Sequence, residues 1–177
     1  MNNRVCEIEG GTLKAREVSE NHLVFEAGDQ LAEVYLKEGM IDAVSFREGK
    51  VQSEISLQSA HQITVGENNW TRDVYHFLKP NGPASTMRLG ITIHRGEGTW
   101  SSLPHGFEEN LEEGFEELFY YLLRGGSQTA VQRGKGLLFD GTSVDQVSLV
   151  HNREFAVVPM GYHPVAGEPH VQVSYIW

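Results

Sequence analysis

Short runs of alternating or wholly apolar residues, separated by turn residues, make up most of the chain. The six clearest runs are rich in β-branched and aromatic residues and are bounded by Gly, Pro, Asn or Asp, which is typical of strands. They are residues 22–26, 41–46, 88–94, 117–123, 154–158 and 171–177. Many short strands with regular glycine-containing turns between them predict an all-β sandwich or barrel.

One segment, DQLAEVYLKEG, fits either type of element. Asp29 could cap a helix that ends at Gly39. Ala32, Val34 and Leu36 instead alternate as in a strand. We favour a strand, because strands are predicted on both sides of the segment.

Composition narrows the class of protein and its partners. A chain of 177 residues favours a single domain with a sizeable core. The formal net charge is −10 with no basic run, which argues against nucleic acid and anionic membranes as partners. The single cysteine, the absence of an apolar opening segment and the lack of any long apolar run lead us to expect a cytoplasmic protein. No CxxC, HExxH or GxSxG motif is present.

Two of the eight histidines stand out by their surroundings. His105 lies in the stretch GTWSSLPHGFEEN, directly after a proline and shortly before two glutamates. His163 lies in PMGYHP, where Gly161 would form a tight turn and Pro164 would fix the exit of the chain. Imidazole and carboxylate groups are common metal ligands, so both positions are candidates for a metal site.

A glutamate opens the apolar run ELFYYLL. On a strand, Glu117, Phe119 and Tyr121 share one face, and Glu116, Leu118 and Tyr120 share the other. Either both glutamates lie at the exposed start of the strand, or Glu117 turns inward because a cation offsets its burial. The alternation alone leaves both open.

In this order, the motifs resemble the two metal motifs of a cupin barrel. More specifically, GTWSSLPH, then EELFYY, then GYHP resemble the 5-deoxy-glucuronate isomerase family of inositol catabolism, which is similar to the 5-keto-4-deoxyuronate isomerases. The family pattern reads G-x-WSS-x-PPHKH, EE-x-YY and P-x-GYHP. The resemblance implies an all-β, cupin-type double-stranded β-helix, or jelly-roll barrel, over about residues 63–177. Residues 1–62 would form an N-terminal β-rich extension within a single domain.

The resemblance also implies a divalent metal ion, held in the family by two histidines of the first motif, a glutamate and a third histidine. Carried over by position, Glu117 takes the glutamate role and His163 that of the last histidine. The first motif departs from the pattern. With one residue deleted, His105 and Phe107 match the two histidines, and without the deletion Glu108 falls on the second. The predicted ligands are His105, Glu108, Glu117 and His163, with Glu109 as the alternative to Glu108. Such a set suits zinc first, then manganese, iron or nickel.

The reaction implied is a metal-dependent aldose–ketose isomerisation of a small sugar acid. The cation would polarise a carbonyl, and a nearby group would move a proton between adjacent carbons. Candidates for substrate binding or proton transfer are Tyr121, Tyr162 and Arg133, and Arg133 could pair with the substrate carboxylate. Pairing through edge strands would make a homodimer. The alternatives are a metal-dependent cupin oxygenase and a non-catalytic sugar-binding or regulatory cupin.

Overall fold

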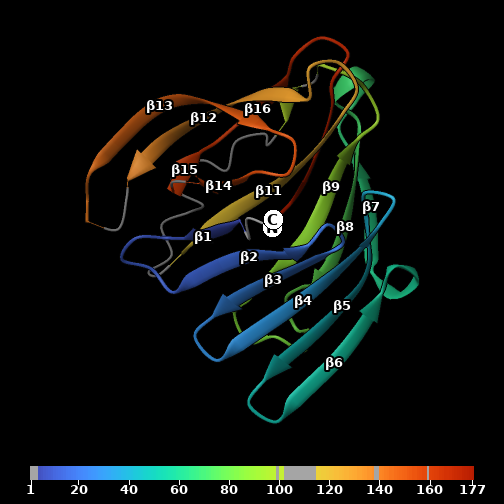
Figure 1. The fold of residues 1–177 in the computed structure, drawn as a ribbon, viewed down its shortest axis with the longest axis vertical. Helices are drawn as coiled ribbons and strands as arrows, with labels where there is room; N and C mark the ends of the chain where they lie inside the picture. Colours follow the sequence, from blue (N-terminus) through green and yellow to red (C-terminus); the bar gives the residue numbers. More distant parts are fainter. Residues whose placement is uncertain (1–3, 99, 102–114, 138–139, 159) are drawn as a thin grey trace.

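A computed structural model describes residues 4–98, 100–101, 115–137, 140–158 and 160–177. The described chain is built from antiparallel strands, and Figure 1 shows the six N-terminal strands side by side in chain order. These strands are β1 (Val5–Glu7), β2 (Leu13–Ser19), β3 (His22–Ala27), β4 (Gln30–Lys37), β5 (Met40–Glu48) and β6 (Val51–Ser56). They form a meander in which each strand pairs with the next, so this sheet contains only local connections.

Two further sheets face each other and form the barrel. The second sheet has the order β14-β11-β17-β9-β8-β7, and the third has the order β10-β16-β12-β13, with β15 also pairing with β12. Their strands are β7 (His61–Val65), β8 (Arg72–Leu78), β9 (Leu89–His94), β10 (Trp100–Ser101), β11 (Glu117–Arg124), β12 (Thr129–Leu137), β13 (Ser143–His151), β14 (Phe155–Val158), β15 (Met160–Tyr162), β16 (Val165–Gly167) and β17 (Gln172–Ile176). Neighbours such as β9 and β17 are far apart in sequence, as expected for a jelly roll.

Helices are confined to two short 3₁₀ turns in the described chain, Leu57–Ser59 and Asn68–Trp70. No helix of the described residues has the length and apolar character needed to span a bilayer.

The central strands of the second sheet, β11, β17 and β9, separate two apolar cores. Leu118 and Tyr120 of β11 pack into the core shared with the N-terminal sheet. Phe119 and Tyr121 pack into the core between the second and third sheets, which is the barrel interior. The predicted division of this strand into two faces is therefore confirmed.

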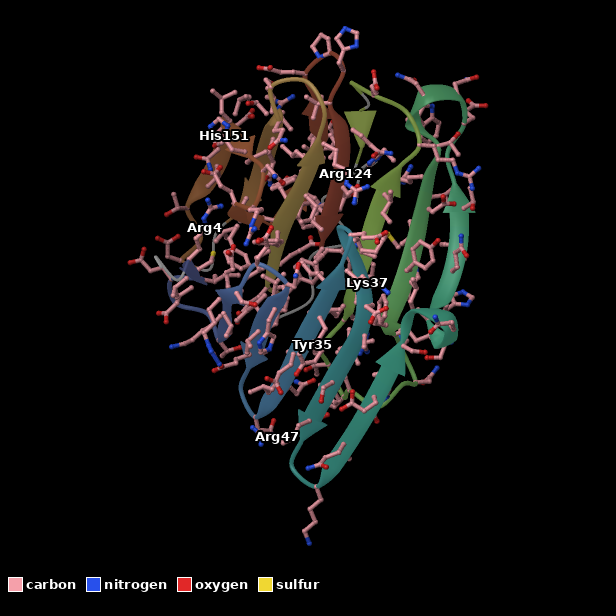
Figure 2. All side chains as sticks on the ribbon, turned by 45° about the vertical axis from the view of Figure 1, so that its right-hand side comes forward. Arg4, Tyr35, Lys37, Arg47, Arg124 and His151 are labelled. Atoms are coloured by element: carbon pink, nitrogen blue, oxygen red, sulfur yellow. The ribbon has the colours of Figure 1, made fainter. Side chains whose placement is uncertain are left out.

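All six strands predicted from the sequence form, within two residues of their predicted ends. The ambiguous segment is also a strand, β4, in which Ala32 and Val34 are buried. Tyr35 and Lys37 lie on its exposed face (Figure 2). The pattern did not single out strands such as β6, β7 and β13, because they bury few residues and so lack a continuous apolar face.

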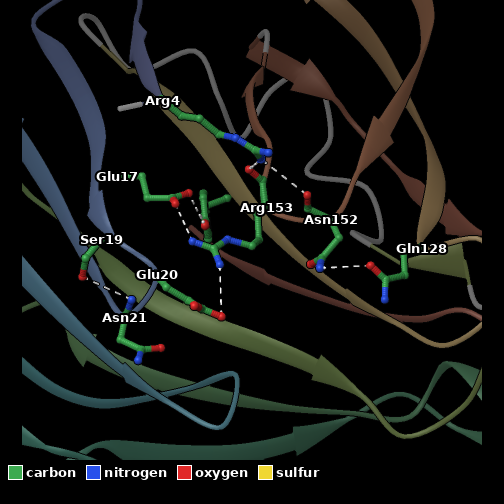
Figure 3. Close-up of polar contacts among 9 residues, drawn as sticks. Arg4, Glu17, Ser19, Glu20, Asn21, Gln128, Asn152 and Arg153 are labelled. Carbon is green, nitrogen blue, oxygen red and sulfur yellow. Dashed lines mark hydrogen bonds and ion pairs between the residues drawn. The ribbon is translucent and has the colours of Figure 1, made fainter. Parts of the chain in front are cut away.

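A polar cluster around Arg153 joins the N-terminal sheet to the barrel (Figure 3). Arg153 lies between β13 and β14 and donates a hydrogen bond to Glu17 of β2. The hydroxyl of Tyr120 donates to the other carboxylate oxygen of Glu17 at 2.8 Å. Arg153 also pairs with Glu20 at 3.4 Å, and the Arg4 guanidinium donates to the Arg153 carbonyl. The side chain of Glu17 is only 15% exposed, and Arg153 is its closest cationic partner.

We expect Arg153→Met to lower the free energy of unfolding by about 2 kcal/mol, because it leaves the Glu17 carboxylate largely buried without its cation. Urea unfolding measures the change. The matched control is Arg16→Met, which removes an ion pair to Glu26 whose two side chains are both more than 40% exposed. That control should cost well under about 1 kcal/mol. Equal losses in the two variants would contradict a special role for Arg153.

Candidate metal centre

Glu117 and His163 meet at one end of the barrel interior. Glu117 begins β11 on its inward face, and His163 follows β15. The Nε2 atom of His163 lies 3.4 Å from Oε2 of Glu117, and the two side chains are 1% and 17% exposed. Nδ1 of His163 donates to the carbonyl of Gly161 at 2.7 Å, which directs the lone pair of Nε2 toward the glutamate. Gly161 adopts a φ of 111°, a conformation that favours glycine.

The surroundings of Glu117 disfavour its charged form. Burial raises the pKa of its carboxyl group to about 7. Its buried Oε2 accepts no hydrogen bond from the described residues. A carboxylate in such a place is costly unless a cation compensates it. The sequence allowed Glu117 to lie either at the exposed start of the strand or facing inward, and in the structure it faces inward.

The first motif lies outside the described residues. His105 and Glu108, together with the alternative Glu109, belong to this part of the chain. Within the described ranges, no group of three or more His, Cys, Asp or Glu side chains is arranged to hold a metal ion. The structure therefore brings together two of the four predicted ligands, and the complete ligand set stays a prediction.

Tyr121 lies on the same inward face as Glu117, four residues further along β11. Its hydroxyl donates a hydrogen bond of 2.9 Å to Oε1 of Gln132 on β12. Burial raises the pKa of Tyr121 well above its ordinary value, so the hydroxyl stays protonated and acts as a donor. Phe119 lies beside His163 with ring centroids 5.7 Å apart and stacks on Tyr175 at 4.4 Å. These aromatic rings line the interior next to the candidate metal centre.

Gln132 was not among the predicted site residues, although its buried side chain faces the interior. The available signal was strand alternation, since Gln132 and Arg133 are neighbours and only one of them can point inward. The alternating Gly134 and Gly136 lie on the inward face with Gln132, whereas Lys135 is exposed.

Arg133 and Tyr162, predicted as candidates for substrate binding or proton transfer, lie on the outer face of the third sheet. Arg133 donates to both carboxylate oxygens of Asp145 at 3.0 and 3.2 Å. Its guanidinium lies 5.7 Å from the ring centroid of Tyr162. Strand alternation is the physical reason, because Gln132 occupies the inward position on β12. The guanidinium predicted to bind a substrate carboxylate is thus already paired.

A cleft of about 400 Å³ opens at the end of the barrel where β11 begins. Its walls come from four places: the N-terminal sheet, the segment before β9, the start of β11, and Trp177 after β17. Among its lining residues are Phe25, Thr86, Arg88, Glu116, Glu117 and Trp177. Glu116 is engaged elsewhere, since its carboxylate accepts hydrogen bonds from the backbone of Thr12 at 2.7 and 2.8 Å. The cleft therefore joins the N-terminal sheet to the end of the barrel that carries Glu117.

Facing antiparallel sheets around an apolar interior, with an N-terminal β-sheet packed on one of them, define an all-β, cupin-type barrel protein. The chain belongs to the KduI/IolB family, whose model matches residues 19–177. A solved IolB-like protein from Salmonella typhimurium LT2 has the same fold, with a TM-score of 0.62 at 22% identity over 93% of this chain and 60% of that chain.

Curated relatives carry the name 5-deoxy-glucuronate isomerase. The protein from Geobacillus kaustophilus is 32% identical over 154 residues, which are 81% of this chain and 54% of that protein. The protein from Bacillus subtilis strain 168 is 33% identical over 114 residues, which are 62% of this chain and 41% of that protein. The chain thus spans about half the length of the curated relatives it matches.

Proposed function

We propose that this chain is a metal-dependent isomerase that interconverts the aldose and ketose forms of a sugar acid, of the 5-deoxy-glucuronate isomerase type. The observation that carries the proposal is the buried pair of Glu117 and His163 at the open end of the barrel, 3.4 Å apart. The names of the curated relatives support the same reaction class.

The residues of the pair fit a divalent cation. Glu117 offers a buried carboxylate oxygen, and His163 offers Nε2, because its Nδ1 donates to a backbone carbonyl. We propose that His105 and Glu108 complete the ligand set. When bound, a divalent ion supplies Lewis-acid polarisation of a substrate carbonyl. Imidazole and carboxylate ligands suit zinc, with manganese, iron and nickel as alternatives.

The other described side chains shape the environment of the reaction. The Tyr121 hydroxyl remains protonated at neutral pH, so it serves as a hydrogen-bond donor rather than as the base. Gln132 fixes the direction of that hydroxyl through the bond to its Oε1. Phe119 and Tyr175 form an apolar wall that limits the access of water to the buried carboxylate.

Metal removal tests the proposal. We expect the purified protein to contain about one equivalent of a divalent metal and to interconvert 5-deoxy-glucuronate and its ketose isomer without oxygen. Chelation should abolish this activity, and restoring the metal should bring it back. Elemental analysis and an anaerobic assay measure these results. A strict requirement for oxygen would indicate the oxygenase instead. Sugar-acid binding without turnover and without stoichiometric metal would indicate a non-catalytic binding protein.

A further inference from the structure

Arg88 lies directly before β9 and lines the same cleft as Glu117. In the observed register, Tyr121 pairs with Tyr175, and Tyr175 pairs with Thr92. The ladder ends at Trp177, which exchanges backbone hydrogen bonds with Gly90, and Arg88 and Glu117 lie just beyond this end of the ladder. Both residues line the cleft of about 400 Å³, together with Trp177.

The Arg88 guanidinium has no acidic partner among the described residues. Nη1 donates to the carbonyls of Met87 at 2.9 Å and Ala84 at 3.4 Å, and Nη2 donates to the carbonyl of Ser85 at 3.4 Å. These bonds fix the orientation of the Arg88 guanidinium. No described residue accepts a hydrogen bond from its Nε. The edge formed by Nε and Nη2 can donate two parallel hydrogen bonds to a carboxylate. Arg133, in contrast, already uses this edge on Asp145.

The N-terminal sheet fixes the segment that carries Arg88. The buried Gln30 of β4 donates to Thr86 Oγ1 at 2.6 Å and accepts from the backbone of Met87 at 2.8 Å. Glu48 of β5 accepts from the backbone of Ser85 at 2.9 Å. These bonds order the residues just before Arg88, so the position of its guanidinium does not depend on the barrel alone.

We propose that Arg88 binds the carboxylate of the sugar acid, so that the carbonyl end of the substrate lies at Glu117 and His163. This inference rests on the proposed isomerase function for the identity of the substrate. The cleft has a volume usual for small-molecule sites, about 400 Å³, and Glu117 and Arg88 are both among its lining residues. The N-terminal sheet then contributes to substrate recognition, by orienting Arg88.

The test is Arg88→Gln, which removes the charge and the fork of donors. A bidentate hydrogen bond to a charged group contributes about 1.5–3 kcal/mol, so KM for the sugar acid should rise roughly 10- to 150-fold with kcat changed far less. Arg88→Lys should recover only part of the loss, since lysine offers a point charge without the fork. Arg124→Gln is the matched control, because Arg124 is exposed at the opposite end of β11 and donates to a backbone carbonyl (Figure 2).

Calorimetric titration with glucuronate and with glucose separates this inference from the isomerase proposal, because it needs no turnover. The wild-type protein should bind glucuronate and not glucose, and Arg88→Gln should lose that preference while keeping its circular dichroism spectrum and melting temperature. This result supports Arg88 even if the wild type proves inactive as an isomerase. Unchanged glucuronate affinity in a folded Arg88→Gln protein, or no glucuronate binding by the wild type, would overturn the inference.

Discussion

His163→Ala is expected to remove the bound metal and to reduce kcat/KM for the sugar acid by roughly 10³-fold or more. Of the two predicted ligands that the structure describes, the imidazole is the better placed, being 1% exposed with Nδ1 held by the Gly161 carbonyl. Lewis-acid polarisation contributes several kcal/mol to stabilising the transition state. Each 1.36 kcal/mol by which the activation free energy falls corresponds to about a tenfold gain in rate. Elemental analysis of the purified variant and an isomerase assay measure the two effects together.

Two further variants make the result for His163 interpretable. Glu117→Gln keeps the size of the side chain and removes its charge, so metal affinity should fall without the cavity that alanine leaves. His170→Ala is the matched control, since the His170 side chain is 83% exposed and pairs with Glu97 at 3.4 Å. It should retain metal and activity. A folded His163→Ala protein with its full metal content would show that His163 is not a ligand.

Local pattern predicted the parts of this site that depend on strand alternation. The positions of Phe119 and Tyr121 on one face of β11 follow from a period of two, and the structure has them there. The inward direction of Glu117 did not follow from the pattern alone, because a strand end can be exposed or buried. It is decided by the distant segment that brings His163 to 3.4 Å.

The positions of Arg133 and Arg88 relative to the site could not be predicted from the sequence. Arg133 was predicted to be able to pair with a substrate carboxylate, yet the phase of β12 turns Gln132 inward and Arg133 toward Asp145. Arg88 carries no motif, and its place on the same cleft as Glu117 depends on two pairings, β11 with β17 and β17 with β9. Such register between strands far apart in sequence has no local signature.

His94 is a second buried histidine, whose environment opposes its protonation. The residue ends β9, is 0% exposed, and its Nδ1 donates to the Val173 carbonyl at 2.7 Å. Its Nε2 is buried without a hydrogen bond from or to the described residues. Burial lowers the pKa of His94 from 6.5 to about 4. The positive charge of the cross-strand Arg72 also lowers this pKa, whereas the hydrogen bond to Val173 raises it. At neutral pH the folded protein therefore holds this imidazole neutral.

We expect this histidine to make the protein less stable as the pH falls from 6.5 toward 4. In that window the unfolded chain binds a proton that the folded chain does not, so the free energy of unfolding decreases by about 2 kcal/mol between pH 7.5 and 5 and by about 3 kcal/mol in full. His94→Asn keeps a donor for the Val173 carbonyl and removes the titration. Urea unfolding of both proteins at the two pH values isolates the effect, because groups such as Glu117 titrate in both and cancel in the difference. An equal loss of stability in the two proteins would show that His94 does not cause it.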